Sequence, residues 1–434
     1  MNDSSLQNPS ASATSVEGAS AKANLLKALG PGILVACAAV GGSHLVWSTR
    51  AGAEFGWSLI FLIILANFLK FPFFLYGQRY TAATGESLLD GYKRLGVGYV
   101  WTFLLINVTT ATINIAGVGM VTGALLKGYG MGEASVTVLS VVMIALCTAM
   151  ILLGHYKLLD RLSKTVMIIL ALCTFAAVLF AMCRGSVAPE GYVGPSPWNL
   201  ATLPFMVSLL GWMPAPVDLS AWSSLWIFSR SKDTGHFATV KETSVDFYLS
   251  YAATAVLAVA FVALGRYVMF GSGQSFSASG TGFAFQLVNL YSATIGDWSR
   301  WLILSCAFLT MFSTTITCVD GYPRALAAST LLVAGRQARE FRRIHQIWIV
   351  AISLSAAIVV LYFVKDLMQM LVFATVVSFV TSPILAWINL RVMSGANVPE
   401  KHRPGLFLRI VSWAGLAFFA IMGLGYLYVL LSGV

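Results

Sequence analysis

Long runs of apolar residues are the feature that most constrains what this sequence can fold into. Of the 434 residues, 58% are hydrophobic and 10% are charged, whereas soluble domains carry about 25% charged residues. A helix needs about 20 apolar residues to cross a bilayer, and eleven segments reach that length. They are Gly32–Glu54, Trp57–Tyr80, Tyr99–Leu126, Ala134–Gly154, Leu162–Met182, Ala201–Phe228, Val245–Phe270, Trp298–Ser329, Ile347–Val364, Leu367–Val392 and Leu406–Leu431. The sequence therefore predicts an all-α integral membrane protein with eleven transmembrane helices.

The sequence also predicts the structure of two segments outside these apolar runs. Residues 1–21 are rich in serine and alanine and lack the apolar centre of a signal peptide, so we expect a disordered cytoplasmic tail. The remaining residues, 22–434, are expected to form one membrane domain. Within the connection between the seventh and eighth spans, Gly282–Ser292 is predicted to form a short helix at the membrane surface.

The distribution of positive charge predicts the orientation in the membrane. Most of the 27 lysines and arginines lie in connections that share a side with the N-terminus, and such residues are enriched in cytoplasmic loops. We expect a cytoplasmic N-terminus and, after eleven spans, an external C-terminus, in what is predicted to be a bacterial inner (plasma) membrane. The net charge of +10 is then explained by topology, and we expect the lipid bilayer as partner and no nucleic acid.

The chain shows none of the patterns expected of an enzyme. Its six cysteines lie in or beside apolar runs without a CxxC spacing, which is typical of packed hydrophobic residues. The sequence contains no nucleophile elbow, clustered metal-ligand motif or phosphate-binding loop. We therefore predict no enzymatic activity and no cofactor, and we expect a monomer.

Two of the predicted spans are interrupted near their middle. The first breaks at Gly41–Ser43, and the sixth breaks at Met213–Pro216, where two closely spaced prolines cannot continue a regular helix. The two spans open two five-helix halves, about 30–183 and 199–393, followed by an extra helix at 406–431. Interruptions at equivalent places in two halves indicate an inverted-repeat transporter with a central site. Close helix packing at the glycines and a structural kink at the prolines remain alternative explanations.

Several short stretches resemble the Nramp family of proton-coupled divalent-metal transporters. "GPGILVACAAV" and "LVWSTRAGAEFGWSLIFLIILANFL" resemble the start of that family, and the likeness continues through "ATGESLLDGYKR". "MPAPVDL" is similar to the family's "MPHNL" break, and "MFSTTITCVDGY" to part of its eighth helix. The resemblance implies a LeuT-like fold with an inverted 5+5 repeat, broken helices 1 and 6, and transport by alternating access.

The residues that carry the family's function are substituted in this chain. On the "DPGN" break of the first helix, the resemblance places Gly41 at the metal-binding Asp and His44 at the Asn. On the sixth helix it places Ala215 at the metal-binding Met, Val217 at the following His and Asp218 at the Asn. A metal site of the family's usual kind is therefore not expected.

The proton path implied by the resemblance is also substituted. On the third helix, Asn114 and Gly117 stand where the family has the Asp and the Glu of that path. Separately, Trp222 on the sixth helix stands where the family has a further His. We therefore expect the usual proton coupling to be absent.

The residues predicted to bind substrate lie at or shortly after the two breaks. They are Gly41, Ser43, His44, Met213, Ala215, Asp218 and Trp222. Of these, His44 and Asp218 are the possible metal ligands, and together with Asn114 and Asp320 they are the predicted residues of a coupling or proton path.

Each ionisable residue also has an ordinary structural explanation. His44 could be a neutral core histidine that donates to a freed carbonyl, and Asp218 could cap the second half of the sixth helix. A further hypothesis has His44 and Asp218 facing each other as a titratable pair. Lys70 lies in the middle of the second span, where a charge needs a partner, and Asp320 is one that it could have.

Three functions follow from these observations. The first is an Nramp-like secondary active or facilitative transporter of a small solute, by family a divalent metal cation. The second is a transporter of the same architecture for an organic or anionic small molecule, since half-helix N-termini suit anions and tryptophan faces suit organic cations. The third is a non-transporting relative.

Overall fold

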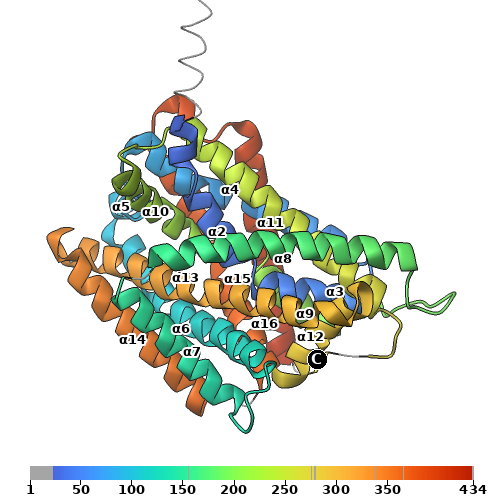
Figure 1. Ribbon diagram of the computed structural model, residues 1–434. Coiled ribbons are helices and arrows are strands. Elements are labelled where there is room, and N and C mark those ends of the chain that lie inside the picture. Colours follow the sequence, from blue (N-terminus) through green and yellow to red (C-terminus); the bar gives the residue numbers. More distant parts are fainter. Residues whose placement is uncertain are drawn as a thin grey trace, which may run out of the picture.

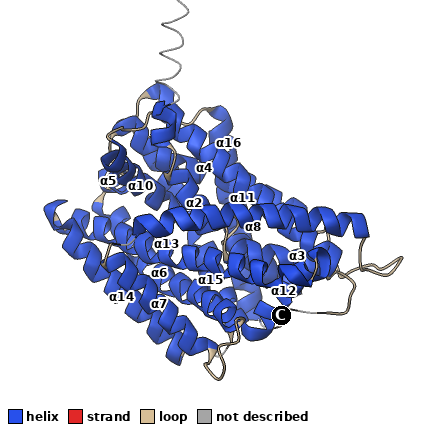
Figure 2. Cartoon of the chain, viewed as in Figure 1, coloured by secondary structure: helices blue, strands red, loops and turns tan. Residues whose placement is uncertain are grey.

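The computed structural model describes residues 23–154, 156–274, 276–277, 280–336, 338–364 and 366–432. Within these ranges every regular element is a helix (Figure 2). In chain order the elements are α2 Pro31–Ala39, η1 Ser43–Ser48, α3 Thr49–Phe55, α4 Ile60–Thr84, α5 Leu88–Leu95, α6 Val97–Lys127, α7 Val136–Leu152, α8 Tyr156–Arg184, η2 Leu200–Thr202, α9 Leu203–Gly211, α10 Leu219–Thr234, α11 Val240–Val268, α12 Gly280–Ile295, η3 Asp297–Ser299, α13 Arg300–Ala334, η4 Ala338–Glu340, α14 Phe341–Tyr362, α15 Leu367–Met393, η5 Glu400–His402 and α16 Leu406–Ser432. The predicted disordered tail lies outside the described residues.

Each of the eleven predicted spans coincides with one helix or with helices on either side of a break. By length and hydropathy, seven of the described helices can cross a membrane, or eight when the bent pair Pro31–Ala39 and Ser43–Phe55 is taken as one span. The apolar helices α7 and α9 are shorter, as is the apolar part of α8. The predicted helix at Gly282–Ser292 is present as α12, and α5 is a short helix that the apolar runs did not predict.

The longest helix, α13, lies inside the bundle and packs most extensively against α6. It also contacts α14, α8 and α7, and α7 and α14 lie together at one edge of the molecule (Figure 1). On the other side α11 packs against α2, α3 and α4. The broken helices α2–η1–α3 and α9–α10 are therefore enclosed by other helices.

Glycine allows α3 and α11 to approach each other at backbone distance. A Cβ placed on Gly52 would lie 1.9 Å from the carbonyl oxygen of Val262, and one on Gly265 would lie 2.1 Å from that of Thr49. Small residues at helix contacts permit this kind of packing in membranes. The half-helix that follows the first break is thus held directly against α11.

The outer helices expose apolar side chains. Only 28% of the most apolar stretch is buried in α14 and in α16, and Leu354, Ile421 and Leu424 are all largely exposed. Contiguous apolar surface of this extent is typical of contact with lipid rather than water.

Candidate functional site

The two breaks predicted from the sequence meet at the centre of the molecule. After α2 ends at Ala39, the chain resumes as the π-helical turn η1, and the axis changes direction by 46° across the break. After α9 ends at Gly211, irregular backbone leads to α10. A Cβ on Gly42 would lie 2.6 Å from Cζ3 of Trp212, so a glycine is needed where the first break touches the second.

A small cavity of about 30 Å³ lies between the breaks. This is enough room for a water molecule or a single ion. Its wall comes from both breaks and from α6 and α13: Ala38, Ala39, Gly42, Ser43, Asn114, Val118, Trp212, Pro214, Ala215, Pro216, Leu219, Thr314, Cys318 and Tyr322. Of the residues predicted to bind substrate, Ser43 and Ala215 line the cavity.

A neutral hydrogen-bond network forms one side of this wall. The Trp212 indole Nε1 donates to Asn114 Oδ1 at 3.2 Å, and Asn114 Nδ2 donates to the Tyr322 hydroxyl at 2.5 Å and to Ser378 Oγ at 3.2 Å. Asn114, predicted for the proton path, is therefore part of the cavity wall. Its amide cannot take up a proton at physiological pH, so it can position a ligand but cannot carry a proton.

His44 is buried beside the cavity but does not line it. Its Nε2 lies 2.9 Å from the carbonyl oxygen of Thr254 on α11, which means that this nitrogen donates. Its Nδ1 lies 2.7 Å from Ser43 Oγ and 3.1 Å from the carbonyl oxygen of Ala39. In a neutral ring Nδ1 is then an acceptor, so His44 donates to the Thr254 carbonyl on α11 and not to a carbonyl freed by the first break. The ordinary structural explanation is correct in making His44 a buried donor to a carbonyl, but that carbonyl belongs to another helix.

Asp218 precedes α10 but does not cap it through its side chain. Its Oδ2 instead accepts hydrogen bonds from Thr110 Oγ1 at 3.0 Å and from Asn107 Nδ2 at 3.4 Å, both on α6. Its Oδ1 has no hydrogen-bond donor in good geometry among the described residues, although the Tyr322 hydroxyl interacts with the carboxylate. The side chain therefore does not form a standard cap, although the carboxylate interacts with the backbone N–H of Leu219 at the start of α10. It lies beside Leu219 and Tyr322 of the cavity wall.

The predicted titratable pair is not formed in this structure. In the part of the chain that is described, no hydrogen bond or ion pair joins His44 to Asp218, because the histidine faces α11 and the aspartate faces α6. Three of the other predicted substrate residues also do not line the cavity. Gly41 faces Thr314, Met213 is fully buried, and Trp222 packs edge-on against Tyr322 with ring centroids 4.4 Å apart.

Asp320 belongs to a separate ion pair, away from the cavity. Its carboxylate accepts from Arg324 NH2 at 2.7 Å and from Arg324 Nε at 3.0 Å, and His345 Nε2 lies 3.8 Å from it. The hypothesis that Asp320 is the partner of Lys70 is therefore wrong.

Lys70 is the important residue whose partners the sequence did not identify. Its buried ammonium donates to three main-chain carbonyls at the second break, those of Leu210, Gly211 and Ala215. The one sequence signal was a lysine in the middle of an apolar span, because such a charge must find partners in the protein. Backbone carbonyls are present in every residue, so the pattern could not show which ones it meets.

No cluster of metal-binding side chains surrounds the cavity in the described ranges. There, no three histidine, cysteine, aspartate or glutamate residues are grouped so that they could hold a metal ion. The donors available at the wall are hydroxyl, amide and main-chain carbonyl oxygens together with the Cys318 thiol.

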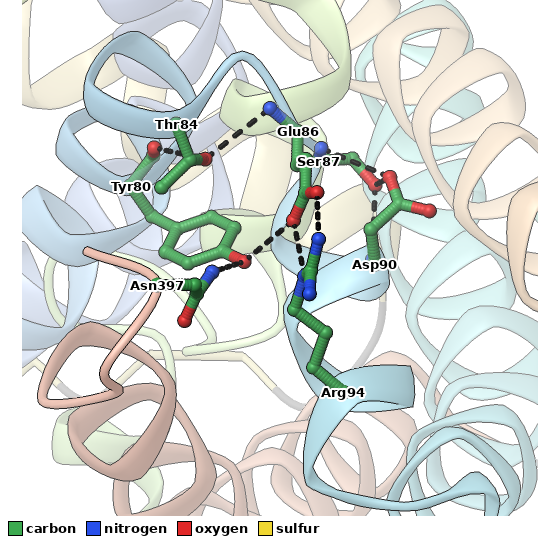
Figure 3. Close-up of polar contacts among 7 residues, drawn as sticks. All are labelled: Tyr80, Thr84, Glu86, Ser87, Asp90, Arg94 and Asn397. Carbon is green, nitrogen blue, oxygen red and sulfur yellow. Dashed lines mark hydrogen bonds and ion pairs between the residues drawn. The ribbon is translucent and has the colours of Figure 1, made fainter.

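The stretch "ATGESLLDGYKR" forms a polar clasp at one end of the bundle (Figure 3). We use "clasp" for Tyr80, Glu86, Arg94 and Asn397: Glu86 accepts from Arg94 and from the Tyr80 hydroxyl at 3.1 Å, and Asn397 donates to that hydroxyl at 2.8 Å. The hydrogen bond from Arg94 holds the pKa of Glu86 below its ordinary value. The clasp joins the α4–α5 connection to the segment before α16, so this motif is structural.

The same stretch also holds the second half of the broken sixth helix. Ser224 Oγ on α10 lies 2.7 Å from Thr81 Oγ1 and accepts from the backbone N–H of Leu88 at 2.8 Å. The position of α10 is thereby tied to α4 and α5.

Comparison with known proteins places this geometry in a family. A model of the natural resistance-associated macrophage protein-like family, Nramp, matches residues 32–430. An uncharacterized protein of Pasteurella multocida is 43% identical over 395 residues, which is 90% of this chain and 89% of that protein.

Solved structures show the same fold. A variant of the Eremococcus coleocola manganese transporter superposes with a TM-score of 0.63 at 13% identity, over 92% of this chain and 86% of that one. MhsT in complex with L-phenylalanine superposes with a TM-score of 0.62 at 14% identity, over 93% of this chain and 98% of that one. The predicted LeuT-like fold is confirmed by these similarities.

Proposed function

This chain belongs to the Nramp family of transporters, and from that premise we propose that it moves a small cation, by family a divalent metal ion, through the central cavity by alternating access. The observation that carries the proposal is the cavity between two broken helices. In transporters built from inverted repeats, such breaks form the substrate site.

The cavity wall suits a cation that prefers oxygen ligands. Ser43 and Thr314 bring hydroxyl groups to it, and Asn114 and Tyr322 bring an amide and a phenol. Oxygen donors suit Mg²⁺, Ca²⁺ and Mn²⁺ better than softer metals. The family's thioether ligand is replaced here by Ala215, so we infer a site without preference for soft metals.

Asp218 supports a cation over an anion. Its buried carboxylate lies behind the wall and interacts with Tyr322, which lines the cavity. The N-terminus of α10 would otherwise attract an anion, but the Asp218 carboxylate already lies at that helix end. An organic or anionic substrate is therefore the second candidate, and transport of such a solute would show it.

We further propose that protons are not coupled in the way the family resemblance implies. Gly41, Asn114 and Gly117 stand at the positions of the family's carboxylates, and none of these three side chains titrates. Asp320 is paired with Arg324 and lies outside the cavity wall.

A larger cavity supports an assignment of the cytoplasmic side. It measures about 570 Å³ and lies where α5, α10, α13 and α14 come together, with Lys93, Arg324 and Arg336 among its lining residues. This concentration of positive charge fits the cytoplasmic face. Along α10, Trp222 lies between Leu219 in the central wall and Leu225 in the wall of the larger cavity. We infer that the Trp222–Tyr322 contact closes the path between the two cavities.

The test is uptake into proteoliposomes of defined orientation. We expect saturable uptake of Mg²⁺, Mn²⁺ or Ca²⁺ without acidification of the lumen, and a loss of at least about tenfold in Thr314→Val because a wall donor is removed. Thr109→Val is the matched control, since Thr109 is exposed on α6 and bonds only its own helix at Leu105.

Three outcomes would contradict the proposal in different ways. Strong manganese uptake that acidifies the lumen would show that protons are coupled after all. Uptake of amines, amino acids or small anions in place of divalent cations would establish the second candidate. Absence of transport and of ligand-induced stabilisation across all these solutes would indicate a non-transporting relative.

A further inference from the structure

The ammonium group of Lys70 lies at the C-terminal end of α9, where the second break begins. Nζ donates to the carbonyl oxygens of Leu210 at 2.7 Å, Gly211 at 3.0 Å and Ala215 at 3.1 Å. The side chain is fully buried. An ammonium has three N–H donors, and here each has one carbonyl acceptor.

These three carbonyls have the character of a cation site. Leu210 and Gly211 end α9, where the last carbonyls carry the negative end of the helix dipole. The Leu210 carbonyl also accepts from the backbone N–H groups of Trp212 and Met213. Ala215 belongs to the irregular backbone before α10. Broken helices coordinate cations with such carbonyls.

The surroundings stabilise a positive charge at this point. Asp218 on the same break interacts electrostatically with Lys70, and the Phe419 ring centroid lies 5.9 Å from Nζ. An apolar side chain at position 70 would remove the hydrogen bonds to the buried Gly211 and Ala215 carbonyls, which is costly in a medium of low dielectric constant. A neutral amide has two N–H donors, whereas the ammonium has three and donates to all three carbonyls.

We propose that Leu210, Gly211 and Ala215 form a binding site for a monovalent cation, and that the Lys70 ammonium is its resident, covalently tethered cation. The second break is then held in place without a free ion. A variant that lacks the ammonium exposes the site to a free cation of the class of Na⁺ or a small alkylammonium. This inference concerns the carbonyl site and does not depend on which solute the protein transports.

The experiment measures thermal unfolding of the full-length protein in detergent at constant ionic strength. Wild type, Lys70→Ala and Lys70→Gln are compared in choline chloride, LiCl, NaCl, KCl and ethylammonium chloride. We expect the wild-type midpoint to be the same in all five salts. Both variants should unfold at lower temperature in choline, and Na⁺ or ethylammonium should raise their midpoints saturably, as for a ligand that binds only the folded state.

Lys127→Met is the matched control. Lys127 Nζ also donates to two main-chain carbonyls, those of Gly132 and Ala134, but it does so in an exposed turn. Water can replace it there, so we expect a small loss of stability and no dependence on the cation.

Three results would overturn the proposal. One is a cation-specific shift in wild type, which would show that the ammonium does not fill the site. Another is a Lys70→Gln variant as stable as wild type in choline, since a neutral donor would then suffice. The third is a loss of stability that no cation in the series restores. If neither variant can be purified in choline, purification is repeated in each cation: folded protein only with Na⁺ or ethylammonium supports the site, and failure in every salt overturns it.

Discussion

The two helix breaks that meet at the central cavity are stabilised in different ways. At the first break, the carbonyl oxygen of Ala39 receives a hydrogen bond from the neighbouring Ser43 hydroxyl at 2.7 Å, and the chain continues as a π-helical turn. At the second break, the carbonyls depend on Lys70, which comes from α4 and is 140 residues away from Leu210 in sequence. The first break is thus completed largely by its own residues, whereas the second also needs a side chain that is distant in sequence.

This difference has a consequence for stability. The first break uses neutral groups, the Ser43 hydroxyl and the His44 imidazole. The second uses the buried Lys70 ammonium, which interacts electrostatically with the buried Asp218 carboxylate without a direct ion pair. Removing a buried charge or its hydrogen-bond partners costs more than removing a neutral group, so the second break is expected to be the more sensitive of the two.

The largest effect is expected for Asp218→Ala. We expect a loss of about 2–4 kcal/mol in the free energy of unfolding, because the buried Asn107 and Thr110 donors lose an acceptor and Lys70 loses a favourable electrostatic interaction. Asp366→Ala is the matched control. Asp366 precedes α15 and caps it, because its Oδ1 accepts a hydrogen bond from the N–H of Gln369 at 2.7 Å. Loss of that cap is expected to cost about 1 kcal/mol. Unfolding in mixed detergent micelles measures both, and equal losses would show that the charge at the second break has no special role.

A methyl group on Gly42 tests the contact between the breaks. Gly42→Ala places a Cβ against the Trp212 ring, so we expect overpacking of about 1–3 kcal/mol and a strong reduction of transport. In Gly98→Ala the added Cβ meets nothing within 4 Å, and that variant should be unaffected. Thermal unfolding and proteoliposome uptake measure the two effects, and full activity of Gly42→Ala would mean that the breaks need not touch.

Variants of His44 and Ser43 distinguish residues that stabilise the first break from residues that bind substrate. His44→Ala removes the hydrogen bond to the Thr254 carbonyl, which keeps its partner within α11, so we expect a loss of about 1 kcal/mol. It should change substrate affinity little because the ring does not line the cavity. Ser43→Ala should lower the free energy of unfolding less than His44→Ala does. It should weaken substrate binding more, since Ser43 lies in the cavity wall. Binding calorimetry decides: a folded His44→Ala protein that no longer binds substrate would restore His44 as a ligand.

The clasp, which lies outside both breaks, should give the smallest effect. Glu86→Gln is expected to cost less than about 1 kcal/mol, because the Glu86–Arg94 pair is partly exposed. Since the pKa of Glu86 is lowered in the folded state, its contribution is present above the ordinary value of 4.5 and is lost as the pH falls through the lowered pKa. The difference in unfolding midpoint between wild type and Glu86→Gln should therefore shrink on acidification, and a difference that grows instead would contradict this account of the clasp.

Much of the architecture could be predicted because its determinants are local. Apolar length predicted the helices, and the chemistry of Gly41–Ser43 and Met213–Pro216 predicted where two of them break. Most of the site could not be predicted in the same way. Trp222 and His44 are close to the breaks in sequence, yet Trp222 packs on Tyr322 and His44 turns to Thr254, because neighbouring helices decide which way a side chain near a break is directed.

By itself, the sequence determined that this protein is a bundle of apolar helices with two interruptions, since helix length and helix breaking depend on residues that are adjacent in the chain. Only the tertiary structure decided that Lys70 meets the carbonyls at the second break, that Asp218 faces α6 and that Asp320 pairs with Arg324. The physical reason is that a buried charge must find partners, and which partners it finds depends on how the helices pack, which is not encoded in any short stretch of the chain.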